Sequence, residues 1–179
     1  MRRPLVGAAV WLAGFALFSV AVKTTVLRRP AGDVRFQQGQ ELPNFALHDA
    51  GGRRFELDDV VKRNRVVLIT FWATWCGPCR IELPHLDVLY RDKKERGLEV
   101  LAVNEDEDPA AMTKYLAEKP LGFPVLRDRH GKLAHHLGVK GYPTSILVGR
   151  NRRVLLVVNG LASFMDVAIE AHLKDGKSG

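Results

Sequence analysis

Residues 71–79 read FWATWCGPC and contain both cysteines of the 179-residue chain, Cys76 and Cys79. The stretch completes a continuous apolar run, Val66–Trp72, which is typical of a strand buried on both faces. It also opens a segment, residues 76–95, whose apolar side chains have helical spacing. Two cysteines three residues apart in a first helical turn share one face and can form a disulfide. The sequence therefore predicts a dithiol where a buried strand meets a helix.

The position of this pair favours redox chemistry over a structural role. Unpaired N–H groups and the helix dipole stabilise a thiolate at a helix N-terminus, so we expect an exposed, nucleophilic Cys76 there. Cys79, one turn deeper, would resolve the mixed disulfide. A disulfide that closes so small a loop adds little stability. Haem attachment would need a histidine where Arg80 stands, and zinc would need further ligands, so no metal or cofactor is predicted.

The composition is that of a globular protein, with 46% apolar and 26% charged residues, which excludes wholesale disorder. The net charge of +7 is unevenly distributed. Residues 1–35 hold six basic residues against one acid, whereas residues 36–179 hold 21 against 19. The body of the chain is therefore nearly neutral, and its basic character does not support nucleic-acid binding.

Residues 4–22 form a stretch of 19 residues without a charge. As a helix it would be about 28 Å long, close to the roughly 30 Å hydrocarbon core of a bilayer. We expect residues 1–22 to be either an uncleaved membrane anchor or a cleaved secretory signal, because Ser19-Val20-Ala21 offers a small-x-small cleavage site. Residues 23–40 are predicted to be a linker, and residues 41–179 a single domain.

The remaining patterns predict an α/β domain with a mixed sheet between helices. Pro84 lies inside the helix at 76–95 and is expected to kink it. The acidic run Glu105–Asp108 is interpreted as a solvated loop before a helix. The other expected elements are a glycine-turn hairpin around residues 49–52, a short helix at 57–62, strands at 99–103, 145–148 and 154–158, and helices at 109–119 and 164–173.

Three motifs in this order resemble the thioredoxin fold. Residues 71–79 are similar to its active-site motif, Pro84 matches its helix-kinking proline, and residues 141–144 (GYPT) match its cis-proline loop. The resemblance covers residues 41–175 and implies a cis bond before Pro143. It also implies a substrate groove lined by Trp75, Gly77 and Pro78 on one side and by Tyr142, Pro143 and Thr144 on the other.

Within this superfamily the chain is most similar to the TlpA/ResA-like membrane-anchored thiol:disulfide oxidoreductases. The apolar N-terminal segment, a hairpin that begins at residues 42–45 and an acid at Glu82 carry this similarity. Ordinary thioredoxins have a buried aspartate where this chain has Thr70. The resemblance implies that Glu82, three residues after Cys79, supplies the carboxylate that deprotonates the resolving cysteine. The alternative is that Glu82 is an exposed helix acid without a role.

The resemblance implies an extracytoplasmic protein-disulfide reductase on the cytoplasmic membrane, or one released to the periplasm if residues 1–22 are cleaved. Expected partners are a disulfide-containing client, such as the haem-site cysteines of apocytochrome c, and a membrane electron donor resembling CcdA or DsbD. Two alternatives stay open: a disulfide oxidase or isomerase of the same fold, and a membrane-tethered binding or chaperone module. The Pro-x-x-x-Thr-x-x-Cys pattern of a peroxiredoxin does not precede Cys76.

Overall fold

The computed structural model of the protein describes residues 35–174. The predicted anchor or signal, residues 1–22, and most of the predicted linker lie outside the described residues. Within residues 35–174, no helix combines the length and the apolar character that crossing a bilayer requires.

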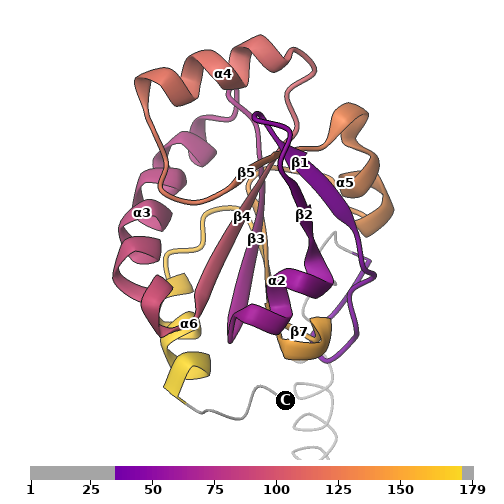
Figure 1. The fold of residues 1–179 in the computed structure, drawn as a ribbon, viewed down its shortest axis with the longest axis vertical. Helices are drawn as coiled ribbons and strands as arrows, with labels where there is room; N and C mark the ends of the chain where they lie inside the picture. The colour runs from indigo at the N-terminus through magenta and orange to yellow at the C-terminus, as the bar shows by residue number, and fades with distance from the viewer. Residues whose placement is uncertain (1–34, 175–179) are drawn as a thin grey trace, which may run out of the picture. The chain divides into compact units, whose positions relative to one another are not determined.

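A mixed sheet of seven strands forms the centre of the described domain, in the order β2-β1-β5-β4-β3-β6-β7 (Figure 1). Strands β3, β4 and β5 are parallel to one another, and the other neighbours pair antiparallel. This confirms the predicted mixed α/β sheet, including the hairpin β1–β2. The strands are β1 (Ala46–Asp49), β2 (Arg54–Glu56), β3 (Val66–Trp72), β4 (Leu98–Asn104), β5 (Val125–Arg127), β6 (Thr144–Gly149) and β7 (Val154–Asn159).

Helices pack on both faces of the sheet and divide the core into two clusters. Side chains of α3, α4 and α6 belong to one cluster, and side chains of α2 and α5 belong to the other. The helices are α2 (Leu57–Arg63), α3 (Gly77–Lys93), α4 (Pro109–Glu118), α5 (Lys132–Leu137) and α6 (Met165–Lys174), with 3₁₀ turns at Lys94–Arg96, Arg129–Gly131 and Arg150–Arg152.

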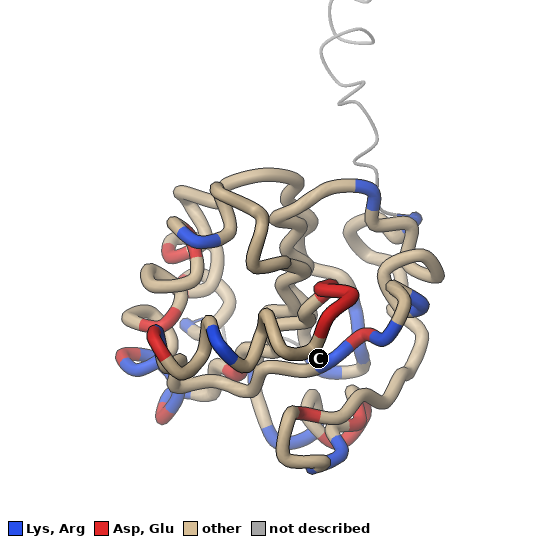
Figure 2. The backbone as a smooth tube through the Cα atoms, turned by 90° about the horizontal axis from the view of Figure 1, so that it is seen from above, with Lys and Arg blue, Asp and Glu red and all other residues tan. Residues whose placement is uncertain are grey.

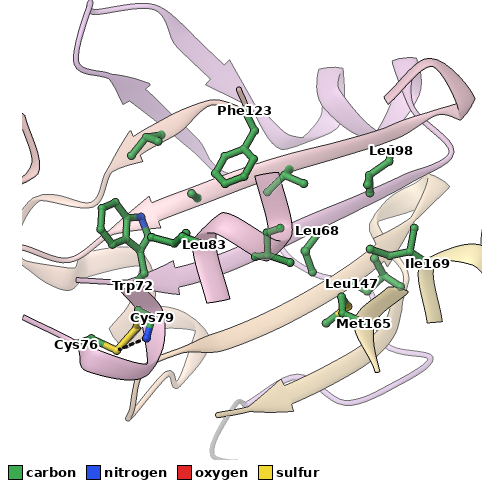
Figure 3. Close-up of a cluster of buried hydrophobic side chains, with 14 of the residues drawn as sticks. Leu68, Trp72, Cys76, Cys79, Leu83, Leu98, Phe123, Leu147, Met165 and Ile169 are labelled. Carbon is green, nitrogen blue, oxygen red and sulfur yellow. Dashed lines mark hydrogen bonds between the residues drawn. A yellow bond between two sulfur atoms is a disulfide. The ribbon is translucent and has the colours of Figure 1, made fainter. Parts of the chain in front are cut away.

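Strand β3 is buried along its whole length because it lies between β4 and β6 and is covered on both faces. Alternate side chains of a strand point to opposite faces, and β3 supplies both core clusters in this way. Figure 3 shows the cluster beneath α3 and α6, where Leu68 and Trp72 of β3 lie near Leu83 and Ile169. The strand is therefore held rigidly up to Trp72, and the dithiol follows four residues later.

The structure differs from the predicted elements at two points. Helix α3 continues through Pro84. The N–H that proline lacks would bond to the carbonyl of Arg80, which is an exposed residue, so water can satisfy that carbonyl. Strand β5 was not predicted from the sequence, because it has only three residues and owes its existence to pairing with β4 and β1.

Candidate active site

The two cysteines form a disulfide at the N-terminus of α3 (Figure 3). Cys76 is the N-cap residue of the helix, and its Cα lies 5.3 Å from that of Cys79. The backbone N–H of Cys79 donates a hydrogen bond to the Sγ of Cys76, with an N–S distance of 3.2 Å. A donor directed at this sulfur, together with the helix dipole, favours a negative charge on Cys76 when the pair is reduced.

The prediction that Cys76 is exposed is wrong for the disulfide form. Cys76 is 5% exposed and Cys79 is fully buried. Both residues belong to the core cluster that contains Trp72 and Leu83, because the disulfide draws the Cys76 side chain against the first turn of α3. The small remaining exposure still distinguishes the two sulfurs, since only Cys76 can be reached from solvent.

The residues around the pair form a surface with an aromatic wall. Trp75 is 69% exposed, and its ring meets that of Tyr142 edge to face, with the ring centroids 5.6 Å apart. The peptide bond between Tyr142 and Pro143 is cis, as the resemblance implied. Gly77 and Pro78 are exposed beside the disulfide. Four of the residues predicted for the groove therefore present accessible surface next to Cys76.

Thr144 occupies a different place from the other groove residues. Its side chain is buried, and its hydroxyl donates to the carbonyl of Gly141 at 2.8 Å and lies 3.1 Å from Oδ1 of Asn159. Both contacts tie the loop that carries Pro143 to itself and to β7. Thr144 thus holds the cis-proline loop in place and offers little side-chain surface to a substrate.

Glu82 is buried, which excludes the alternative of an exposed helix acid. Its Oε1 accepts a hydrogen bond from the backbone N–H of Ala162 at 3.0 Å. Burial raises the pKa of the Glu82 carboxyl, and the Ala162 hydrogen bond and the charge of His85 oppose that rise. Side chains three residues apart on a helix lie about 5–6 Å apart at Cβ, so Glu82 and Cys79 are neighbours on α3.

Thr70 is fully buried in β3, and its Oγ1 lies 3.1 Å from the Oγ of Ser145 in β6. A hydroxyl pair therefore stands where an ordinary thioredoxin has its buried carboxyl group. Because Thr70 carries no carboxylate, Glu82 on α3 is the buried acid nearest in sequence to the dithiol.

Asp106 is a residue of the site that the sequence interpretation missed. Its carboxylate accepts hydrogen bonds from the backbone N–H and the hydroxyl of Thr74, at 3.0 Å and 2.9 Å. It also accepts one from Nδ2 of Asn104, at 2.8 Å. Thr74 lies two residues before Cys76, so Asp106 ties the dithiol loop to the end of β4.

The acidic run is therefore only partly the solvated loop that we predicted. Glu105 and Asp106 are half-buried and turn inward, whereas Glu107 and Asp108 are exposed. Asp108 caps α4 by accepting a hydrogen bond from the N–H of Ala110. The run appears in Figure 2 as the longest continuous red stretch of the tube. The parallel pairing of β3 with β4 could have indicated this arrangement, because it places the ends of the two strands side by side.

Within residues 35–174, no three histidine, cysteine or acidic side chains are grouped so as to hold a metal ion. The chemistry available at the site is that of the dithiol itself, which can exchange electrons with another disulfide. A disulfide at a helix N-terminus, beside a cis-proline loop and on this sheet, defines a thioredoxin-like thiol–disulfide oxidoreductase.

Comparison with known proteins gives the same class and a family. The AhpC/TSA family matches residues 38–157, and the chain belongs to this family. Thiol-disulfide oxidoreductase ResA of Bacillus thuringiensis subsp. konkukian is 35% identical over 126 residues, which cover 70% of this chain and 72% of the relative. ResA of Bacillus subtilis is 34% identical over 130 residues, covering 73% and 72%. The predicted resemblance to ResA-like oxidoreductases is confirmed.

A solved structure agrees with these sequence relatives. The Chlorobium tepidum protein described as a thiol:disulfide interchange protein DsbE superposes with a TM-score of 0.70 at 36% identity. The match covers 80% of this chain and 99% of that protein. The thioredoxin-like fold and thiol–disulfide oxidoreductase activity are therefore both supported by relatives that span most of the described domain.

Proposed function

We propose that the chain reduces disulfide bonds in client proteins, with Cys76 as the nucleophile. The Cys76 thiolate attacks one sulfur of the client disulfide and forms a mixed disulfide, and the other client sulfur leaves as a thiolate. Cys79 then loses its proton and attacks the Sγ of Cys76, which releases the second client thiolate. The client gains two electrons and two protons, and the pair ends as the Cys76–Cys79 disulfide. The observation that carries this assignment is the Cys79 N–H donated to Cys76 Sγ.

Glu82 is proposed to accept the proton of Cys79 during the second step. Its burial and its position one turn after Cys79 support this role, because a buried carboxyl group with a raised pKa is a stronger base than an exposed one. Thr70 has no acidic proton acceptor to offer from the strand.

The groove that receives the client is proposed to lie between two segments. Trp75, Gly77 and Pro78 form one wall, and the Tyr142–Thr144 loop forms the other. The exposure of Trp75 and its edge-to-face contact with Tyr142 support this arrangement. An extended client segment could lie across the cis-proline loop, with its disulfide brought to Cys76.

The domain is proposed to work outside the cytoplasm, with residues 1–22 as anchor or signal, residues 23–40 as linker and residues 41–179 as the catalytic domain. The uncharged stretch at residues 4–22 supports this location. So does the likeness to a Streptococcus pneumoniae protein described as an exposed lipoprotein thioredoxin, at 26% identity and a TM-score of 0.63. A membrane electron donor resembling CcdA or DsbD would re-reduce the pair, and apocytochrome c cysteines are a candidate client.

The direction of electron flow is tested by the reduction potential of the Cys76–Cys79 pair. The full chain is equilibrated in defined thiol buffers, and the oxidised and reduced fractions are read by mass after alkylation. A value near or below about −250 mV, in the range of thioredoxin, supports the reductase. A value of about −120 to −180 mV, like those of a strong oxidant or an isomerase, would replace it with those activities.

Trapping experiments separate the enzyme from a binding module. Cys79→Ser should accumulate a mixed disulfide with a protein disulfide substrate, because the resolving thiol is gone. Cys76→Ser is the matched control and should neither trap nor reduce the substrate. If Cys76→Ser kept the full biological activity of the chain, a binding or chaperone module would be the better account.

A further inference from the structure

Glu105 and Asp128 bring two carboxyl groups together beside the cis-proline loop. Glu105 follows the end of β4, and its backbone N–H donates to the carbonyl of Trp72 at 2.9 Å. Asp128 follows the end of β5 and is 3% exposed. The two side chains share a hydrogen bond. Two carboxylates at that distance would repel each other, so the contact requires a proton between them.

The surroundings of Glu105 offer its carboxyl group little else to bond with. Its Oε1 is buried and has no hydrogen-bond partner. Its Oε2 faces the backbone of Gly131, where a Cβ atom would lie only 3.1 Å away. Asp128 is held by the N–H of Ala134, which donates to Oδ2 at 2.8 Å. Glu105 is thus fixed against Asp128 by packing on one side and by the end of β4 on the other.

Burial and the charge of Asp128 raise the pKa of Glu105 to about 9. Glu105 is therefore protonated at neutral pH and donates its O–H to Asp128. The neighbouring Asp106 is directed away, toward Thr74 and Asn104. A cavity of about 190 Å³ that Asp128 lines is also lined by charged or titratable side chains from the neighbouring segments: Asp106, Glu107, Arg127, Arg129 and His130.

The acid pair acts directly on the aromatic wall of the groove. The pKa of the Tyr142 phenol is raised to about 12, first by burial and then by the negative charges of Glu105 and Asp128. Tyr142 precedes the cis-proline and contacts Trp75, which lies next to Cys76. A change of charge at Glu105 would therefore be felt by the residue that joins the two walls of the groove.

We infer that Glu105 is a positioning residue for the Tyr142–Pro143 loop, which it supports through a hydrogen bond donated to Asp128. While the pair holds its proton, the loop keeps Tyr142 against Trp75 and the groove accepts a protein disulfide. When Glu105 ionises, repulsion from Asp128 moves the two acids apart and displaces the loop. The inference rests on the proposed reductase function only in that the groove binds a client.

The test compares two substrates of different size on the same dithiol. The reduced full chain is reacted with native insulin, whose disulfides lie in a folded polypeptide, and with oxidised glutathione, which needs little of the groove. The ratio of the two second-order rate constants is measured between pH 7 and pH 10. Both reactions use the Cys76 thiolate, so the ratio cancels its titration and reports the groove alone.

In the wild-type chain the insulin-to-glutathione ratio should fall about three- to tenfold as the pH rises through about 9. Glu105→Gln keeps a hydrogen-bond donor but cannot ionise, so its ratio should stay flat over this range. Glu107→Gln, an exposed acid of the same run, is the matched control and should keep the wild-type fall. A flat wild-type profile, or an undiminished fall in Glu105→Gln, would overturn the inference.

A second readout needs no activity and no folded Glu105 variant. Tryptophan emission of the oxidised wild-type chain should show a transition near pH 9 that disappears in Trp75→Phe, because Tyr142 leaves the Trp75 ring. Its absence would overturn the inference even if insulin were never reduced. Failure to reduce insulin at any pH, with the emission change present, would instead count against the proposed reductase.

Discussion

The Asp106→Ala substitution tests how the dithiol loop is held. In the wild-type chain one carboxylate accepts from the Thr74 N–H, the Thr74 hydroxyl and the Asn104 side chain. Alanine removes all three acceptor contacts at once. The donors belong to two segments that no other side chain joins in this way, one ahead of Cys76 and one at the end of β4.

The expected loss of stability follows from these contacts. A hydrogen bond to a charged group contributes about 1.5–3 kcal/mol, but three bonds to one half-buried carboxylate share its charge, and water replaces part of the loss. We therefore expect Asp106→Ala to lower the free energy of unfolding by about 2–4 kcal/mol. For a domain of this size that corresponds to a fall in Tm of about 6–16 °C.

Urea unfolding followed by tryptophan emission measures this loss, and Glu107→Ala, an exposed neighbour, is the control, with an expected change under about 0.5 kcal/mol. A double-mutant cycle adds specificity. Thr74→Val should cost less in the Asp106→Ala background than in the wild-type chain, because its partner is already gone. A loss for Asp106→Ala no larger than that of Glu107→Ala, or fully additive Thr74 and Asp106 effects, would refute the reasoning.

Two further predictions concern carboxyl groups with opposite shifts. Glu82→Gln should slow resolution of the mixed disulfide about tenfold or more in single-turnover experiments. Because burial raises the pKa of Glu82 in the folded state, the wild-type residue costs stability as the pH rises, so thermal melts should show a stabilisation by Glu82→Gln that grows from acid to neutral pH. A variant that resolved at the wild-type rate would remove Glu82 from the mechanism. Glu170 has its pKa lowered to about 2, chiefly by its hydrogen bond to Arg96 and then by Lys93. Its contribution to stability should be complete above the ordinary value of 4.5 and lost as the pH falls toward 2. The Tm difference between wild type and Glu170→Gln should therefore be full at pH 7 and close in acid, and a constant difference would contradict the ion pair.

Much of the fold could be predicted from the sequence because its signals are local. The apolar run Val66–Trp72, the turn between β1 and β2 and the Asp108 cap of α4 each depend on residues close together in the chain. Strand β5 could not be found in this way. Three residues carry no readable period, and their strand exists only because β4 and β1 lie on either side.

The dithiol was predicted better than its environment. The spacing of Cys76 and Cys79 indicates a redox pair, but the spacing alone does not say how closely the first turn of α3 is packed. The sequence led us to expect an exposed Cys76, and the structure leaves it 5% exposed. The burial of Glu82 likewise depends on Ala162, which lies 80 residues further along the chain.

The acidic run shows why composition could not identify the rest of the site. Four consecutive acids have the same chemistry on paper, yet their roles are set by where β4 ends. Trp72 pairs with Asn104 in the parallel register, so the residues that follow each strand emerge side by side. Asp106 can then reach Thr74, and Glu105 can reach Asp128 at the end of the next parallel strand. Ligands bind at the carboxyl ends of parallel strands in open α/β sheets, and here the same edge gathers the side chains that hold the dithiol loop.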